Sequence, residues 1–244
     1  MVEKSEFYEI DTGVAEVLHE PDGSMVLLVN GVPSSHIVPG EPERLDFSYM
    51  RWIAAAIEET RSWEKPRLTH LGGAGCSLPR YFAHVWPHSR NTVVEWDMDL
   101  AQLAREKFDI PRSPLVKIRV GDAREVTDGF VDASRDVIIR DVFESATTPR
   151  SLTTLPFYHS CLRSLSSTGL YVANCGSRGD LTEAEFRRFV EAAHALQNCP
   201  LYIDDTPALP INQLAARARK LKRTHGLDVL MVDYLQLLKA ASAK

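Results

Sequence analysis

Apolar and polar positions along this chain follow two periods, one of about two residues and one of about 3.6 residues. Short apolar runs predict strands at residues 68–71, 91–97, 116–120, 136–141 and 169–175. Apolar residues at helical spacing predict helices at residues 47–63, 78–85, 99–108, 155–165 and 180–196. Because strands alternate with helices, we expect an α/β fold with a parallel sheet, which binds ligands at the carboxyl ends of its strands.

The first 45 residues follow a different pattern. Two short runs, at residues 14–18 and 25–29, flank a Pro-Asp-Gly-Ser turn at residues 21–24. Such an arrangement predicts a β-hairpin or a small meander. We therefore expect an N-terminal β unit at residues 1–45 and an α/β core at residues 46–199.

A glycine-rich turn follows the strand at residues 68–71. It consists of Gly72, Gly73, Ala74 and Gly75, and a helical pattern begins shortly after it. Glycines let the backbone turn sharply and approach a ligand, and the free N–H groups at a helix start favour an electron-rich group. Glycine turns after strands are common, so this motif alone does not identify a ligand.

Acidic residues stand at the carboxyl ends of three expected strands: Glu95, Asp122 and Asp141. Glu95 follows Gly72 by roughly 20 residues, the spacing of an acid that bonds ribose hydroxyls. A carboxylate suits a ribose diol because it accepts two O–H bonds at once. The alternative is a solvated acid that caps the next helix, a role for which Asp97 and Asp99 are better placed.

The other two acids also have two interpretations each. Asp122 could accept a hydrogen bond from an adenine amino group, or it could form an Asx turn after Gly121. Asp141 ends the most hydrophobic strand and has Glu144 nearby. Two neighbouring carboxylates could hold a cationic amine and take a proton from it. The alternative for Asp141 is an ordinary loop acid.

Composition and missing motifs narrow the function further. The net charge of −5 argues against broad nucleic-acid binding and suits a cationic substrate. The four cysteines and the scattered histidines lack metal-ligand spacing, and no serine has a GxSxG context, so neither a metal site nor a serine nucleophile is expected. The chain has no apolar run of transmembrane length and no signal segment, so we expect a cytoplasmic protein without membrane partners.

Taken together, the glycine turn, Glu95, the Gly121-Asp122-Ala123 segment and Asp141 resemble the spermidine synthase family of aminopropyltransferases, over roughly residues 8–197. The resemblance implies a Rossmann-like core of the methyltransferase type beneath a small N-terminal β domain. It implies transfer of an aminopropyl group from decarboxylated S-adenosylmethionine to a polyamine such as putrescine. Methylthioadenosine would be released without a metal or a tightly bound cofactor, and the protein could be a homodimer.

The resemblance assigns nucleoside-binding roles by position. Gly72 and Gly73 fall on the family's glycine-rich loop, and Glu95 falls on its ribose-binding acid. Asp122 and Ala123 fall on the pair beside the adenine.

For the amine half of the site, Asp141 falls on the aspartate implicated in deprotonating the attacking amine. Glu144 replaces a second aspartate of that segment, and Tyr49 aligns with the tyrosine of a Tyr-His-Glu segment. The chain departs from the family at Ser34, Met50, Arg51, Gly75, Val142 and Phe143. Gly75 stands where the family has a loop aspartate. Two alternatives therefore remain, a methyltransferase that uses S-adenosylmethionine and a non-catalytic or engineered chimeric scaffold.

Residues 200–238 change in character and resemble replicative hexameric DNA helicases of the RecA-like class. The resemblance puts the magnesium-supporting Walker B aspartate at Asp233. The chain has no GxxxxGK[ST] phosphate loop for such a strand to serve. Since a strand-helix-strand unit of this size cannot bury a core alone, we predict that residues 200–244 complete the sheet of the core in a chimera. The alternative is a poorly docked tail.

Overall fold

The computed structural model describes residues 4–60, 62–144, 147–175, 211–227 and 229–233, which form two sheets. A four-stranded antiparallel sheet contains β1 (Lys4–Ile10), β2 (Gly13–His19), β3 (Met25–Val29) and β4 (Val32–Ile37). A six-stranded parallel sheet has the order β10-β9-β8-β5-β6-β7. The expected α/β class with a parallel sheet is confirmed.

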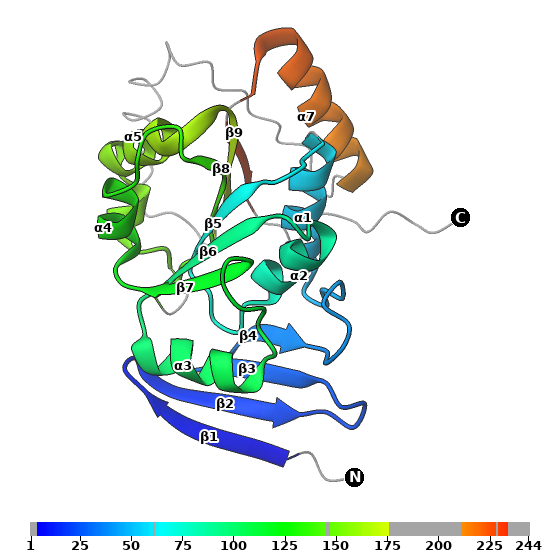
Figure 1. The fold of residues 1–244 in the computed structure, drawn as a ribbon, viewed down its shortest axis with the longest axis vertical. Helices are drawn as coiled ribbons and strands as arrows, with labels where there is room; N and C mark the ends of the chain where they lie inside the picture. Colours follow the sequence, from blue (N-terminus) through cyan, green and yellow to red (C-terminus); the bar gives the residue numbers. More distant parts are fainter. Residues whose placement is uncertain (1–3, 61, 145–146, 176–210, 228, 234–244) are drawn as a thin grey trace, which may run out of the picture.

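The elements of the larger sheet follow the predicted alternation. Its strands are β5 (Arg67–Leu71), β6 (Arg90–Glu95), β7 (Val116–Val120), β8 (Arg135–Arg140), β9 (Leu165–Cys175) and β10 (Val229–Asp233). The helices are α1 (Ser48–Thr60), α2 (Ser77–Val85), α3 (Met98–Lys107), α4 (Ala123–Asp128), α5 (Leu155–Ser164) and α7 (Ile211–His225). In Figure 1 the small sheet lies at the lower end of the molecule, with α3 between it and the larger sheet.

Several elements differ from the expectation, and β1 and β4 lie outside the two strand runs predicted in the N-terminal unit. The sequence does not predict α4, because a helix of six residues is too short to display a helical period. β9 begins at Leu165, ahead of the expected start of that strand. The predicted helix at residues 180–196 and the first tail strand, near residue 202, lie outside the described residues.

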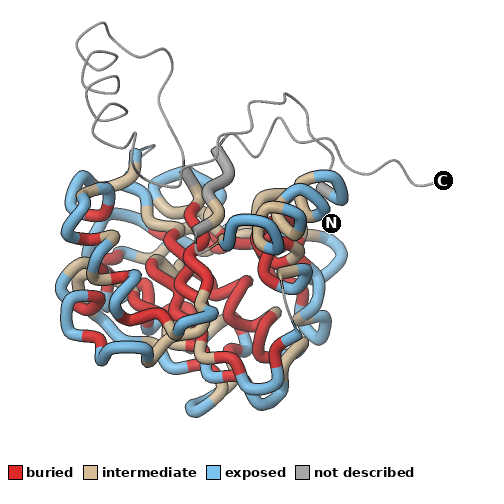
Figure 2. Tube along the Cα trace, turned by 90° about the horizontal axis from the view of Figure 1, so that it is seen from above, coloured by how far each residue is buried: buried red, intermediate tan, exposed pale blue. Residues whose placement is uncertain are grey.

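Buried residues fill the interior of the described fold, as the tube in Figure 2 shows, and many of them belong to the strands of the larger sheet. On one face of the larger sheet, α1 and α2 cover β5, β8 and β9, while α3 and the small sheet cover β6 and β7. On the other face, α4 and α5 pack on β5, β8 and β9. The loops that follow the parallel strands gather at the carboxyl ends of these strands, which is where α/β sheets bind ligands.

Side-chain hydrogen bonds fasten the small sheet to the larger one. Asp97 is almost fully buried, and its Oδ1 accepts from the Leu100 backbone N–H at 2.8 Å, which confirms its role as the cap of α3. Its Oδ2 accepts from the backbone N–H and the hydroxyl of Thr12, both at 2.7 Å. Because the Asp97 carboxylate caps α3 and also binds Thr12 of the N-terminal unit, it connects that unit to the core.

The described part of the tail packs on the larger sheet. β10 pairs in parallel with β9, from Val229 opposite Tyr171 to Asp233 opposite Cys175. α7 lies against α1, where Arg219 forms an ion pair with Glu59. Figure 1 shows this helix beside α1, at the end of the molecule away from the small sheet.

Replacing Leu230 by Ala tests whether β10 stabilises the sheet. Leu230 packs against the cluster of α1, β5, β8 and β9, and we expect its loss to lower the free energy of unfolding by about 1–2 kcal/mol, less than for a fully buried leucine. Urea unfolding measures the change. The matched control is Leu155→Ala at a position 63% exposed, for which the change should stay within about 0.5 kcal/mol. Equal effects of the two variants would contradict a docked tail.

Candidate functional site

The glycine turn after β5 packs directly against the segment that follows β8. Gly72 has a φ of +85°, and a Cβ placed on it would lie 2.3 Å from the backbone oxygen of Asp141. A Cβ on Gly73 would lie 2.4 Å from Cγ1 of Val93. Neither position accepts a side chain, so glycine is required there by the close approach of neighbouring strands.

Glu95 bonds to this turn. Its Oε2 accepts from the backbone N–H groups of Gly73 and Ala74, at 3.0 and 3.1 Å, and its Oε1 accepts from Asp97 N at 3.2 Å. Two N–H groups of the glycine turn therefore donate to an acid of the protein itself. A carboxylate has about four acceptor positions, so Glu95 keeps capacity for a ribose diol.

Asp122 is the N-cap of α4. Its Oδ1 accepts from the backbone N–H of Glu125 at 2.9 Å, and Ala123 beside it is buried as the first residue of the helix. Capping uses one of the two carboxylate oxygens, which leaves the other for a ligand amino group. The adenine-side role of Asp122 and Ala123 stays a prediction.

Three elements bring polar side chains together at Asp141, which directly follows β8. Asn174 in β9 donates from Nδ2 to Oδ1 of Asp141 at 2.9 Å, and the hydroxyl of Tyr49 in α1 hydrogen-bonds to the same carboxyl group. Burial raises the pKa of Asp141 above its ordinary value of 3.8, while both hydrogen bonds and the charge of Arg140 oppose that rise. Burial and the Asp141 charge also raise the pKa of Tyr49, so its hydroxyl remains a donor.

Glu144 has a different environment from Asp141. It is exposed, and its backbone forms a tight turn with Thr147, each N–H donating to the other's carbonyl oxygen. Among the described residues, no hydrogen bond or ion pair joins its carboxylate to that of Asp141. The assisting role of Glu144 stays a prediction.

Two of the positions that depart from the resembled family have structural roles. The Gly75 N–H donates to Oγ of Ser35 at 3.0 Å, and a Cβ on Gly75 would lie 2.7 Å from the Ser35 Cβ. An aspartate at position 75 would therefore collide with the small sheet. The Arg51 guanidinium donates to the carbonyl oxygens of Leu45 and Asp46, at 2.8 and 2.6 Å, and holds the chain that enters α1.

Sequence reasoning missed two residues beside Asp141. Asn174 follows an apolar run in β9, and a polar residue at that strand end is the signal that could have identified it. Arg140 is almost fully buried, and it donates to the hydroxyls of Thr148 and Tyr171, at 2.6 and 3.2 Å. An arginine within the apolar run of β8 was the corresponding signal.

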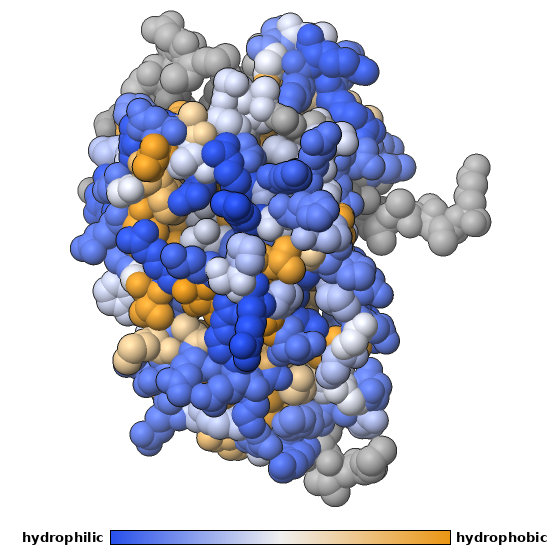
Figure 3. All heavy atoms as spheres, viewed as in Figure 1, coloured by the Kyte–Doolittle hydropathy of each residue, from blue (hydrophilic) through white to orange (hydrophobic). Residues whose placement is uncertain are grey.

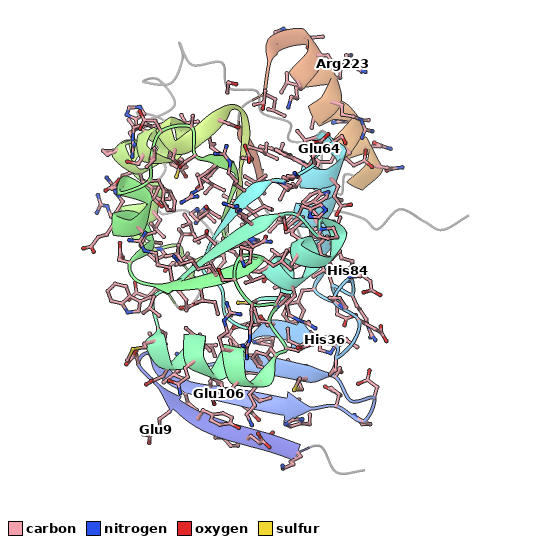
Figure 4. The ribbon with its side chains drawn as sticks, viewed as in Figure 1. Glu9, His36, Glu64, His84, Glu106 and Arg223 are labelled. Carbon is pink, nitrogen blue, oxygen red and sulfur yellow. The ribbon has the colours of Figure 1, made fainter. Side chains whose placement is uncertain are left out.

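A second cluster has the residue types of a catalytic triad. His36, labelled in Figure 4, pairs through Nδ1 with Asp46 and contacts Oγ of Ser24 through Nε2 at 2.9 Å. Ser24 is almost fully buried, and its hydroxyl donates to Asp22 at 2.6 Å. A buried serine whose proton bonds to a carboxylate is a poor nucleophile, so these contacts serve packing of the small sheet.

The described residues contain no group of three or more His, Cys, Asp or Glu side chains that could hold a metal ion. They also contain no helix that is long and apolar enough to cross a membrane. The face of the molecule drawn in Figure 3 is mostly hydrophilic, with apolar side chains gathered in small patches.

Asp141→Asn tests the environment of the half-buried Asp141 carboxyl. Because the folded-state pKa lies above the unfolded value of 3.8, ionised Asp141 destabilises the folded state, and this loss grows as pH rises through the folded-state pKa. Asparagine can keep an acceptor for both donors without the charge. We expect a higher Tm than the parent protein at pH 7 and a smaller difference near pH 4, measured by calorimetry.

The matched control for this stability test is Glu144→Gln, an exposed carboxylate in the same loop, which should leave the Tm unchanged at both pH values. A lower Tm for Asp141→Asn than for the parent at pH 7 would contradict the assigned environment.

The body of the chain is similar to spermidine synthases. It aligns with the structure of a probable spermidine synthase from Corynebacterium glutamicum at 52% identity and a TM-score of 0.69, covering 73% of this chain and 66% of that one. A polyamine aminopropyltransferase from Vibrio vulnificus is 30% identical over 147 residues, 59% of this chain and 48% of the relative. Spermidine synthase from Thermotoga maritima, at 20% identity and a TM-score of 0.52, shares the fold. The Rossmann-like, methyltransferase-type prediction is confirmed.

The C-terminal part has different relatives. Residues 158–244 match the family model of the DnaB-like helicase C terminal domain. The replicative DNA helicase DnaB of Rickettsia bellii is 47% identical over 64 residues, 26% of this chain and 13% of the helicase. The chain thus joins segments with two kinds of relative, as predicted and consistent with a chimera, and it spans less than half of either curated relative.

Proposed function

We propose that this chain is an aminopropyltransferase that moves an aminopropyl group from decarboxylated S-adenosylmethionine to a polyamine such as putrescine. The observation that carries the proposal is the half-buried Asp141, whose carboxyl group is held by Tyr49 and Asn174 beside the glycine turn. A carboxylate that lies within reach of an amine can accept its proton, and a raised pKa makes that carboxylate the stronger base. The similarity to the Corynebacterium glutamicum structure supports the same reaction.

The nucleoside would bind across the ends of β5, β6 and β7. Glu95 would accept hydrogen bonds from the ribose hydroxyls, with Gly72 and Gly73 allowing close approach of the ligand. Asp122 and Ala123 would lie at the adenine. Trp96, which follows Glu95, is 63% exposed and offers an aromatic surface beside that position.

The reaction needs mainly positioning and one proton acceptor. The neutral amine attacks the carbon that joins the aminopropyl group to the sulfonium sulfur. The new C–N bond forms as the C–S bond breaks, and the electron pair of that bond stays on the sulfur of methylthioadenosine. Asp141 makes the amine neutral by taking a proton from its ammonium form before the attack, while the Tyr49 hydroxyl and the Asn174 amide orient the Asp141 carboxylate.

The proposal also gives a role to each of the three segments of the chain. Residues 1–45 would form the lid over the amine, residues 46–199 the nucleoside-binding core, and residues 200–244 the segment that completes the sheet. The partners would be small molecules, a nucleoside and a polyamine. Nucleic acid is not among them, and a homodimer is compatible with the family resemblance.

Glu95→Gln tests the nucleoside half of the site. Removing the charge weakens hydrogen bonds from the ribose diol and from the turn, so we expect methylthioadenosine to bind at least tenfold more weakly in calorimetry. Asp99→Asn, an exposed acid in the first turn of α3, is the control and should bind as the parent protein does. Equal affinity in all three proteins would contradict a ribose contact by Glu95.

Asp141→Asn tests the chemical step. We expect nucleoside affinity to be kept and aminopropyl transfer to putrescine to fall by about 10²–10⁴, because the proton acceptor is lost. Product analysis with decarboxylated S-adenosylmethionine measures the transfer. Unchanged transfer would remove Asp141 from the mechanism. Methyl transfer from S-adenosylmethionine, without aminopropyl transfer, would assign the protein to the methyltransferases instead.

A further inference from the structure

A cavity of about 340 Å³ lies at the amino ends of the strands in the larger sheet, at the other end of the strands from Asp141. Neighbouring strands each contribute a cation to its lining: Arg67 from β5, Arg90 from β6, Lys117 from β7 and Arg135 from β8. Glu64, labelled in Figure 4, lies just before β5 and marks this end of the sheet. The mechanism above uses none of these residues.

The carboxylate of Asp136, which follows Arg135 in β8, is already engaged by other residues. Asp136 binds Arg67 through both oxygens, at 2.8 Å to Nε and 2.9 Å to Nη2, and it also accepts from the Arg67 backbone N–H. The Ser166 hydroxyl donates to the same carboxylate at 3.0 Å. Four hydrogen bonds fill its acceptor positions, so Asp136 compensates Arg67 and has no position left for the other three cations.

Arg135 is the least satisfied of these cations. Its Nε is buried and has no hydrogen-bond partner among the described residues, and Nη1 reaches only the Ser134 carbonyl oxygen at 3.4 Å. The guanidinium lies 4.2 Å from the centroid of the Phe130 ring. Burial, with the charges of Arg67 and Arg119, lowers the pKa of Arg135. A buried donor without a partner destabilises the folded protein, and a bound anion would supply the missing acceptor.

Arg90 and Lys117 are exposed at the mouth of the cavity, and no acidic side chain in the described part of the chain pairs with either. Arg67 lies opposite Arg90 in the pairing of β5 with β6, and Lys117 lies opposite Thr92, two residues further along β6 than Arg90. Cations spread over neighbouring strands in this way match a ligand with several anionic groups better than a single small ion. Guanidinium groups bind phosphate oxygens in pairs, which favours phosphate as the group recognised.

We infer that this cavity is a binding site for a compact polyphosphate, a small ligand with two or more linked phosphate groups. The cavity is concave and is lined by cations from four strands, whereas a long nucleic acid needs an extended basic surface. The net charge of −5 also disfavours a long polyanion. The site is separate from the proposed aminopropyl transfer and does not depend on it.

Calorimetry with pyrophosphate at low ionic strength tests the inference. We expect saturable binding that weakens as salt is added, and binding at least tenfold weaker in the double variant Arg90→Gln with Lys117→Gln. Arg135→Lys, which keeps the charge but loses the paired N–H groups, should also bind more weakly. Inorganic phosphate should bind more weakly than pyrophosphate. Methylthioadenosine affinity should be the same in the double variant and the parent.

The matched control is Lys220→Gln with Arg223→Gln, which removes the same charge from the exposed side of α7, where Figure 4 labels Arg223. This control should keep pyrophosphate binding. Absence of saturable binding, or equal losses in the two double variants, would overturn the assignment to the cavity. Citrate binding as tight as that of pyrophosphate would overturn the choice of phosphate.

Discussion

The approach of Gly72 to the backbone of Asp141 is the contact on which the candidate site depends. At this point three strand ends are joined, because Gly72 N donates to Val94 O at 2.9 Å and Asp141 N donates to Leu71 O at 2.8 Å. Only a hydrogen atom fits between the two loops, since a Cβ on Gly72 would meet the Asp141 oxygen at 2.3 Å. The consequence is that Glu95 and Asp141, 46 positions apart by subtraction of their numbers, lie on either side of one turn.

The two acids beside this turn have opposite environments. Glu95 accepts hydrogen bonds from three backbone N–H groups, which suits a carboxylate that stays an acceptor. Asp141 is desolvated and bonded by two side-chain donors, and the balance raises its pKa. Environments that separate the roles of two carboxylates are the usual basis for assigning one to binding and the other to proton transfer. The division proposed for this chain follows from that difference rather than from residue type.

The sequence predicts the strands, most helices and the strand-end acids well, because each depends on a local period or on its position at a strand end. Tyr49 and Asp141, which the resemblance assigns to the amine half of the site, hydrogen-bond to each other. The hydrogen-bond partners of the glycine turn could not be predicted. A pattern of glycines does not say whether a ligand or a side chain such as Glu95 accepts the hydrogen bonds of its N–H groups. The contact of Gly75 with Ser35 connects the glycine turn to the small sheet, and the basic cavity is lined by residues from four strands. No local sequence pattern predicts either one.

The helicase-like tail raises the question of how a foreign segment can complete this sheet. An outer parallel strand needs only backbone hydrogen bonds, an apolar face and a right-handed connection, and these requirements are common to α/β proteins of unrelated function. β10 meets the first two through its pairing with β9 and the packing of Leu230. Its register sets Val232 opposite Asn174, the residue whose amide holds Asp141. The strand that carries Asn174 is therefore itself paired with the strand of the tail, which links the tail to the candidate site.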